Sequence, residues 1–219
     1  MAMLRKWWPL VQAALLAGCM GYPTRSQEPL GRTFPMDPEV WNGVWLQAPQ
    51  LGIDRPLAFS VSVVDADNGV IAVRLCEEEL ERLRAQPWIN MNSSARGSRW
   101  LQIRRAAPNW VFPIEVEPDA GGGFKVLPGS PYSYSSFGAQ LADVWITYPI
   151  DDDRVRALVE QGALPGTIDG PRVTLGPLEP AHYKVLLSEE RPVVRWQYPG
   201  VAMKLPPDIK PCGKGESAQ

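Results

Sequence analysis

Residues 57–75 read LAFSVSVVDADNGVIAVRL, and this stretch decides the expected fold class. Its first part, residues 57–64, alternates apolar and polar side chains, which is the period of a β-strand with one buried face. Turn-forming residues follow at 65–69, and residues 70–75 form a second strand-like run. Two such runs joined by Asp, Asn and Gly predict a β-hairpin. We therefore expect an antiparallel β-sheet.

Strand patterns recur along the rest of the chain, each bounded by Gly, Pro, Asn or Asp. We expect further strands at residues 41–47, at 99–105 and in the second half of 139–148, a second hairpin at 109–128, and three strands within 171–205.

Two segments are expected to be short helices. Residues 77–86 (EEELERLRAQ) begin with acidic and end with basic side chains, as the helix dipole favours. Residues 151–161 have Asp151 or Asp152 as an N-cap, an apolar edge, and Gly162 after the last turn.

The predicted architecture is mainly β: a single antiparallel barrel or sandwich with two short helices at residues 41–205, then a polar tail at 206–219. The 219 residues are 45% hydrophobic, enough to bury a core. The 19 Gly and 23 Pro favour short strands and turns over long helices. Lys and Arg number 22 against 24 Asp and Glu, a net charge of -2, so nucleic-acid binding is not expected.

The first 19 residues have the pattern of an export signal. Two basic residues precede an apolar run at residues 7–18, which is too short to cross a bilayer at about 20 residues per crossing. The run ends in Leu16-Ala17-Gly18-Cys19, which resembles the lipobox of bacterial lipoproteins. That resemblance implies that residues 1–18 are a signal peptide and that Cys19 becomes an acylated N-terminus anchored in the membrane, with palmitate among its chains. An ordinary secretory signal is the alternative.

The residues after Cys19 predict where the protein is located. Met20 stands where an Asp would indicate retention at the inner membrane, so we expect the outer membrane, with the domain facing the periplasm. Residues 19–40 contain four prolines and no apolar period, and they are expected to form a tether between membrane and domain.

Two cysteines remain beyond Cys19. An even pair in an oxidising compartment predicts a disulfide between Cys76 and Cys212. The alternative is a reactive Cys76 thiol ahead of a helix N-terminus, although the acidic residues at 77–79 oppose a thiolate there.

Catalysis is not expected. His182, the one histidine, is placed in a strand, and no G-x-S-x-G motif is present. Glu115 and Glu117 share one strand face, which we expect to face solvent. An enzyme using His182 or the acidic residues 151–153 is the alternative. We expect no catalytic, metal-binding or cofactor-binding residue.

An aromatic stretch is the expected binding surface. Tyr132, Tyr134 and Phe137 alternate with Ser and Gly, and they offer rings to a sugar, a peptide or a partner protein, although an ordered loop without a ligand explains them as well. We therefore expect a non-catalytic binding or envelope-accessory role, with a protein or cell-wall partner.

A second resemblance concerns residues 43–45. Gly43-Val44-Trp45, at the start of the first strand of the domain, resembles the G-x-W signature of lipocalins. Membership would imply an eight-stranded cup carrying a small apolar ligand. It would also imply that Trp45 closes one end with Arg195 packed across it, and that a disulfide such as Cys76–Cys212 ties the tail to the barrel. A lipocalin-like carrier is thus the alternative function.

The lipid anchor has a direct test. We expect Cys19→Ser to abolish acylation, because the thiol that accepts the acyl chains is removed. Labelled palmitate should enter the wild-type chain and not the variant. Palmitate incorporation in the Cys19→Ser variant would contradict the lipobox assignment.

Overall fold

The computed structural model describes residues 24–49, 56–76, 98–107, 110–126, 132–133, 136–141, 143–188, 190 and 193–209, with the backbone alone at 132–133 and 136–141. Several sequence expectations lie outside these residues: the signal peptide, Cys19, the helix at 77–86, Tyr134, Cys212 and most of the tail.

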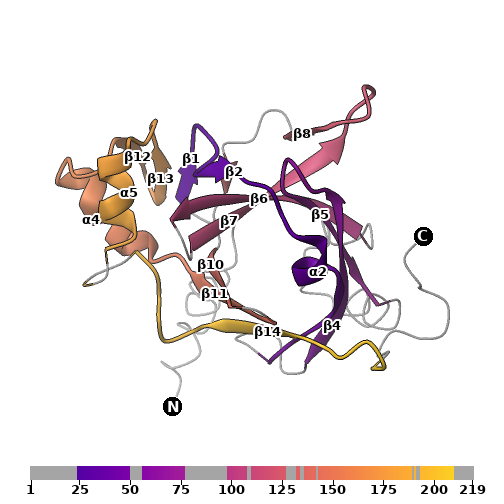
Figure 1. Cartoon of the computed structure of the whole chain (residues 1–219). Coiled ribbons are helices and arrows are strands. Elements are labelled where there is room, and N and C mark those ends of the chain that lie inside the picture. The colour runs from indigo at the N-terminus through magenta and orange to yellow at the C-terminus, as the bar shows by residue number, and fades with distance from the viewer. Residues whose placement is uncertain are drawn as a thin grey trace, which may run out of the picture.

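Eight antiparallel strands form a closed ring within this part of the chain. They are β3 (Gly43–Gln47), β4 (Leu57–Asp65), β5 (Val70–Leu75), β6 (Ser98–Ala107), β7 (Trp110–Pro118), β10 (Ser136–Leu141), β11 (Val144–Pro149) and β14 (Gly200–Lys204). Each strand pairs with the next one in chain order, and β14 pairs back with β3 (Figure 1). The expected mainly β fold is confirmed, as an up-and-down barrel.

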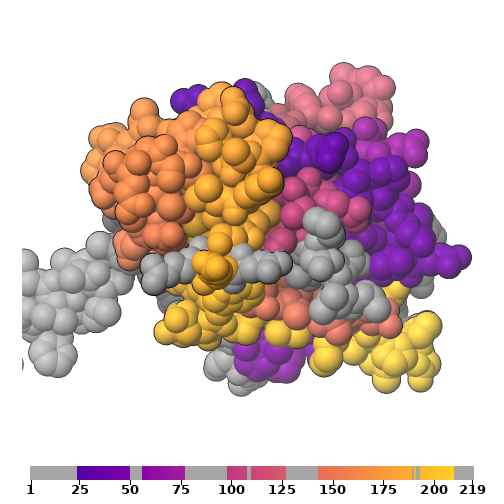
Figure 2. Space-filling model, turned by 60° about the vertical axis from the view of Figure 1, so that its left-hand side comes forward, coloured from indigo at the N-terminus to yellow at the C-terminus, as the bar shows by residue number. Residues whose placement is uncertain are grey.

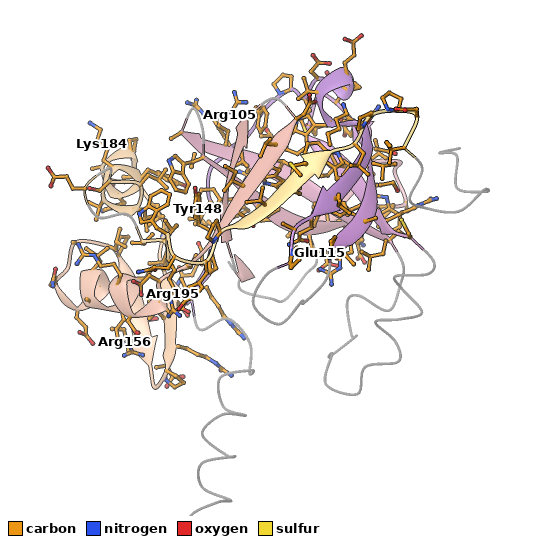
Figure 3. All side chains as sticks on the ribbon, turned by 90° about the horizontal axis from the view of Figure 1, so that it is seen from below. Arg105, Glu115, Tyr148, Arg156, Lys184 and Arg195 are labelled. Carbon is orange, nitrogen blue, oxygen red and sulfur yellow. The ribbon has the colours of Figure 1, made fainter. Side chains whose placement is uncertain are left out.

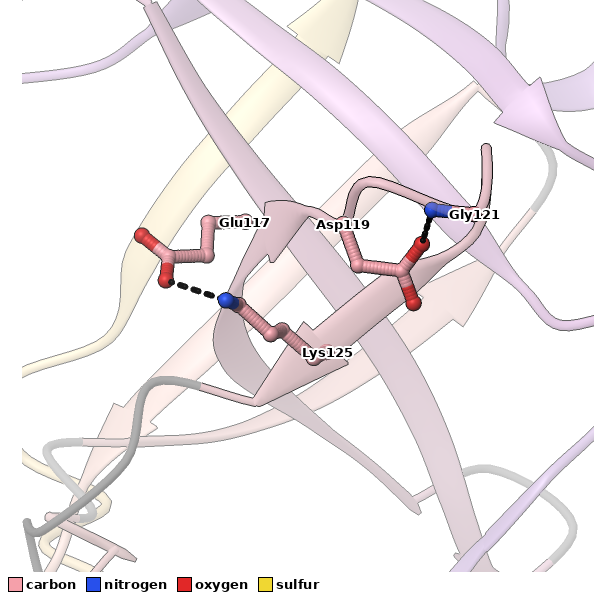
Figure 4. A network of polar contacts seen from close by, with 4 residues as sticks. All are labelled: Glu117, Asp119, Gly121 and Lys125. Carbon is pink, nitrogen blue, oxygen red and sulfur yellow. Dashed lines mark hydrogen bonds and ion pairs between the residues drawn. The ribbon is translucent and has the colours of Figure 1, made fainter.

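The two expected hairpins are present. Residues 57–75 form β4 and β5 with a turn between them, where Gly69 has a φ of 69°. β7 continues into β8 (Phe124–Val126) through a turn at which Asp119 accepts a hydrogen bond from the Gly121 N–H at 2.7 Å (Figure 4). The turn residues therefore fold as their local chemistry predicts.

The barrel interior is an apolar core. Strand alternation turns every second residue inward, and these side chains pack with two residues that precede β3. The buried members are Met36, Trp41, Trp45, Phe59, Val61, Ile71, Ile103, Val111, Trp145 and Ala202.

A short helix closes one end of the barrel. α2 (Pro38–Trp41) lies across the ring of strands (Figure 1). Trp41 is 2% exposed, and its carbonyl oxygen accepts a hydrogen bond from Trp45 Nε1 at 3.1 Å. Lys204 Nζ donates to the carbonyl oxygens of Glu39 at 2.6 Å and Val40 at 3.1 Å. A cation at the helix C-terminus satisfies carbonyls that have no partner within the helix.

The two ends of the barrel differ in their connections. At the α2 end, β4–β5, β6–β7 and β10–β11 are joined by short turns. The opposite end carries the long connections, which are residues 48–56, 76–97, 119–135 and 150–199. The long connections therefore lie together at the end away from α2.

The longest connection forms a module beside the barrel (Figures 1 and 2). It contains α4 (Asp152–Glu160), β12 (Gly166–Asp169), β13 (Arg172–Leu175) and α5 (Pro180–Leu186). β13 pairs in parallel with β1 (Thr24–Ser26), which also pairs with β9 (Tyr132–Ser133). A second apolar core joins Val155, Leu158 and Leu186 of the module to Phe112 and Ile114 of β7.

The tether expectation is wrong for residues 24–40. They form β1, β2 (Arg32–Thr33) and α2, and Leu30 and Met36 are 2% and 4% exposed. The buried apolar residues here, Leu30 and Met36, are separated by turns and polar residues, so they show no period in the sequence. Only residues 20–23 remain between Cys19 and the first described strand.

The three strands expected within residues 171–205 are β13, α5 and β14, so the middle one is wrong. His182 lies in α5, and its Nδ1 accepts a hydrogen bond from the Glu179 N–H at 2.9 Å. Pro180 sits in the first turn, where a missing N–H costs nothing. The helix expected at 151–161 is confirmed as α4, with Asp151 accepting from the Arg154 N–H at 3.2 Å.

Trp45 is 0% exposed, and its loss should cost more than that of any surface tryptophan. We expect Trp45→Ala to lower the free energy of unfolding by about 3–5 kcal/mol, because it leaves a cavity in the barrel. The control Trp196→Ala removes a half-exposed ring and should cost about 1 kcal/mol. Urea denaturation measures both, and equal losses would contradict this account of the core.

Candidate functional site

Solvent exposure on the inward face of β5 rises with distance from α2. Trp45, Ile71 and Ile103 are 0% exposed. Farther from α2, Val73 and Leu75 pack on the same core and are only partly buried. Their backbone register places them on the inward face of β5 together with Ile71. The inward face of β5 is therefore more exposed toward the end opposite α2.

Glu115 extends this inward face on β7. It is the register partner of Leu101, which packs on the interior core, and it is partly buried. Glu115 was expected to face solvent, so that expectation is wrong. Glu117 lies farther along β7 and pairs with Lys125 of β8 at 3.5 Å (Figure 4). The inward face of β7 therefore carries carboxylates at its far end, beyond the apolar part of the wall.

Trp145 carries a hydrogen-bond donor without an acceptor. It belongs to the interior core and is 8% exposed, and its Nε1 has no partner within the described part of the chain. Its ring packs edge-on against Trp41 at 5.6 Å between centroids. The Trp45 Nε1, by contrast, is satisfied by Trp41. A buried donor that loses water without gaining an acceptor costs about 1–3 kcal/mol, and a ligand oxygen would remove that cost.

The resemblance to lipocalins placed Arg195 across Trp45, and that expectation is wrong. Arg195 is exposed and lies on the module, where its positive charge acts on Asp152. Figure 3 shows Arg195 on the module, away from the barrel strand that carries Glu115. Residues 193–199 form no strand, so the last strand begins only at Gly200. Lys204 is the basic residue of that strand and the register partner of Trp45.

A second aromatic group lies outside the barrel. Tyr148 and Trp196 are 4.4 Å apart between ring centroids, and Trp110 lies 6.2 Å and 5.9 Å from them. Trp196 is 48% exposed. Because the strands that bring these rings together are far apart in sequence, only the tryptophan-rich composition hinted at this group.

The aromatic stretch expected to bind a partner is only partly described. The Cα atom of Phe137 pairs with that of Tyr148 in the β10–β11 ladder. Tyr132 pairs with Ser26 of β1 in the other sheet, and Tyr134 lies outside the described residues. The backbone therefore pairs Phe137 with Tyr148, a member of the outer aromatic group, and pairs Tyr132 with Ser26 in the other sheet.

The acidic run at 151–153 is accounted for by structure. Asp151 caps α4, and Asp152 accepts a hydrogen bond from the hydroxyl of Thr24, which is 1% exposed. Burial raises the pKa of the Asp152 carboxyl, while the Thr24 hydrogen bond and the Arg195 charge oppose the rise. This contact fixes β1 to α4. No group of three or more metal-ligating side chains occurs among the described residues.

Cys76 is 3% exposed and follows β5 directly. Such burial does not suit a thiol that reacts with solutes. Since Cys212 lies outside the described residues, their pairing stays a prediction.

Comparisons of the chain with protein-family models, with curated proteins and with solved structures find no match. None of the helices described above has the length and apolar character to span a bilayer.

Asp152 gives a pH-dependent prediction. Because its pKa is higher in the folded state than in the unfolded one, its contribution favours folding at low pH and is lost as pH rises through the folded pKa. Asn keeps the acceptor for Thr24 and does not titrate. We expect the stability of Asp152→Asn relative to wild type to increase between about pH 3 and pH 7.

Chemical denaturation at a series of pH values measures this difference. The matched control is Asp153→Asn, which changes an exposed carboxylate on the same helix turn. The stability difference between Asp152→Asn and wild type could stay constant with pH, or it could follow the Asp153→Asn curve. Either result would show that burial does not raise the pKa of the Asp152 carboxyl.

Proposed function

We propose that this protein is a membrane-anchored, non-catalytic binding protein. Its barrel interior holds a small, largely apolar ligand that carries one hydrogen-bond acceptor. The ligand enters from the end opposite α2 and presents its acceptor to Trp145 Nε1.

The observation that carries the proposal is the unpartnered Trp145 indole within an apolar interior. Trp45 and Ile71 on the inward face are 0% exposed, Phe59 is 7% exposed and Leu75 is partly exposed. Trp145 packs on Trp41 at the α2 end of the barrel and is 8% exposed. An apolar site with one directed polar group is the usual composition of a small-molecule site. The polar group selects the orientation, and the apolar wall supplies the binding energy.

The strand arrangement supports a lipocalin-like form of this proposal. The barrel has eight strands in up-and-down order, and Gly43-Val44-Trp45 begins the first of them. A helix precedes that strand and covers the end of the barrel that Trp45 faces. These features agree with what the G-x-W resemblance implied, apart from the position of the basic residue.

The proposed anchor at Cys19 places this barrel at the outer membrane, facing the periplasm. Because the first described strand begins at Thr24, the link to the acyl chains is short: five residue steps span at most about 18 Å. The domain is then held close to the bilayer surface, because no long tether separates it from the acyl chains.

A second candidate is an accessory role through a protein or cell-wall partner. Trp196 and Tyr198 are 48% and 54% exposed, and rings left on the surface favour contact with another macromolecule. Capture of a specific envelope partner that is lost in Trp196→Ala would favour this candidate.

The interior site is tested with Prodan, an uncharged naphthalene with one ketone whose emission reports both polarity and hydrogen bonding. We expect saturable binding to the purified chain with a blue shift. Trp145→Phe keeps an aromatic side chain, although a smaller one, and removes the N–H, so affinity should fall by about fivefold.

Trp196→Phe is the matched control, because it makes a similar change outside the barrel, and it should leave Prodan affinity unchanged. Thermal unfolding of both variants checks that the barrel is intact. Prodan binding that Trp145→Phe leaves unchanged, or no saturable binding at all, would contradict the interior site.

A further inference from the structure

A groove separates α5 from the barrel. It has a volume of about 640 Å³ and lies between α5 and the strands β2 and β6. Its lining residues are Gly31, Arg32, Arg105, Ala106, Ala107, Leu178, Pro180, Tyr183, Lys184 and Leu187. The groove is distinct from the barrel interior, because none of these residues belongs to the interior core.

The walls of the groove are fixed to each other by hydrogen bonds. The Gly31 N–H donates to the Tyr183 hydroxyl of α5 at 2.8 Å. The Arg104 guanidinium donates to the carbonyl oxygens of Gly31 at 2.7 Å and Leu30 at 3.2 Å. Gly31 has a φ of 72°, and a Cβ there would lie 2.8 Å from the Arg105 carbonyl oxygen. The groove is therefore already formed without a ligand.

Among the described residues that line the groove, three are cations and none is a carboxylate. Arg32 comes from β2, Arg105 from β6 and Lys184 from α5, and all three are exposed. Arg105 and Lys184 lie on the same side of the molecule (Figure 3). Within the described residues, none of the three forms an ion pair, whereas Arg156 of the module lies 3.9 Å from Glu160. This arrangement favours a ligand with negative charge.

Between these cations the groove surface is apolar. Leu178, Leu187 and the two alanines of β6 are partly exposed there, and Pro180 is exposed beside them. A small inorganic anion would make no use of this surface. The combination fits a ligand that carries a charged group next to a hydrocarbon chain.

The position of the groove along the chain indicates where such a ligand comes from. Gly31 and Arg32 are twelve and thirteen residues from Cys19, and β1, which lies between, is fixed to the module. If Cys19 is acylated as proposed, the groove is therefore close to the headgroups of the bilayer. Membranes with anionic lipids attract clustered Lys and Arg.

We propose that this groove binds the headgroup and first acyl carbons of an anionic phospholipid from the anchoring membrane. The guanidinium groups of Arg32 and Arg105 and the Lys184 ammonium contact the phosphate, and the apolar residues contact the acyl chain. The occupied groove orients the domain on the membrane surface. The inference that the lipid comes from the anchoring membrane rests on the proposed anchor at Cys19. The inference that the groove binds an anionic lipid does not.

The test uses the full chain carrying Cys19→Ser, so that the result does not depend on acylation. It is titrated with dihexanoyl-phosphatidylglycerol below its micelle concentration, by calorimetry. We expect saturable binding, at least about tenfold tighter than that of dihexanoyl-phosphatidylcholine or inorganic phosphate. Arg32→Gln and Lys184→Gln should each weaken it by about tenfold.

Two control variants distinguish the groove from other sites. Arg172→Gln removes an exposed cation of β13 that does not line the groove, and Trp145→Phe changes the barrel interior. Both should bind the anionic lipid as the parent chain does. Circular dichroism checks that every variant is folded.

Four results would overturn the proposal. In the first, Arg32→Gln and Lys184→Gln bind the anionic lipid as tightly as the parent chain does. In the second, the parent chain binds the anionic lipid and the choline lipid equally well. The third is loss of binding in Trp145→Phe alone, which would place the lipid in the barrel. Inorganic phosphate that competes at equal concentration would also reject a lipid ligand in favour of a free anion.

Discussion

Pairing of β3 with β14 is the interaction on which the rest of the structure depends. The ladder joins Gln47 to Ala202, Leu46 to Met203 and Trp45 to Lys204, and it connects the first strand of the ring with the last. An open sheet would leave two edges with unpaired N–H and C=O groups. Closure removes both edges and encloses the interior core. It also brings Lys204 to the C-terminus of α2, so that the helix is held over the end of the barrel.

Closure also determines where the module lies. Since β11 and β14 are neighbours in the ring, residues 150–199 must leave the barrel and return to the adjacent position. They do so by packing on the outer face of β7. β7 is consequently buried on both faces, with Val111 in the interior core and Phe112 in the outer one. A strand covered on both sides reads as a nearly continuous apolar run, as residues 110–114 do.

Much of the fold was predictable because it depends on neighbours in sequence. The β4–β5 hairpin follows from alternation and from Gly69, and α4 follows from its capping residue. α5 was missed because its apolar side chains resemble a strand run when the capping at His182 is not considered. The burial of Leu30 was missed because it packs in the outer core with Phe112 and Leu175, which come more than 80 positions later in the chain.

The candidate sites likewise divide into features that neighbours in sequence predict and features that they do not. The G-x-W motif pointed to Trp45, but the missing acceptor of Trp145 and the cations of the groove arise from residues distant in sequence.

The parallel pairing of β1 with β13 has a consequence for secretion. Among the described residues, β1 pairs only with β9 and β13, so its earliest partner in the chain is at residue 132. A protein exported from its N-terminus delivers residues 24–26 long before those partners, and contacts so distant in sequence form late. A peptidase acting beside Cys19 during export would therefore meet a segment whose strand has not yet paired. If the chain is exported as proposed, docking of β1 completes the sheet after the module has crossed, and maturation of the N-terminus need not compete with folding of the domain.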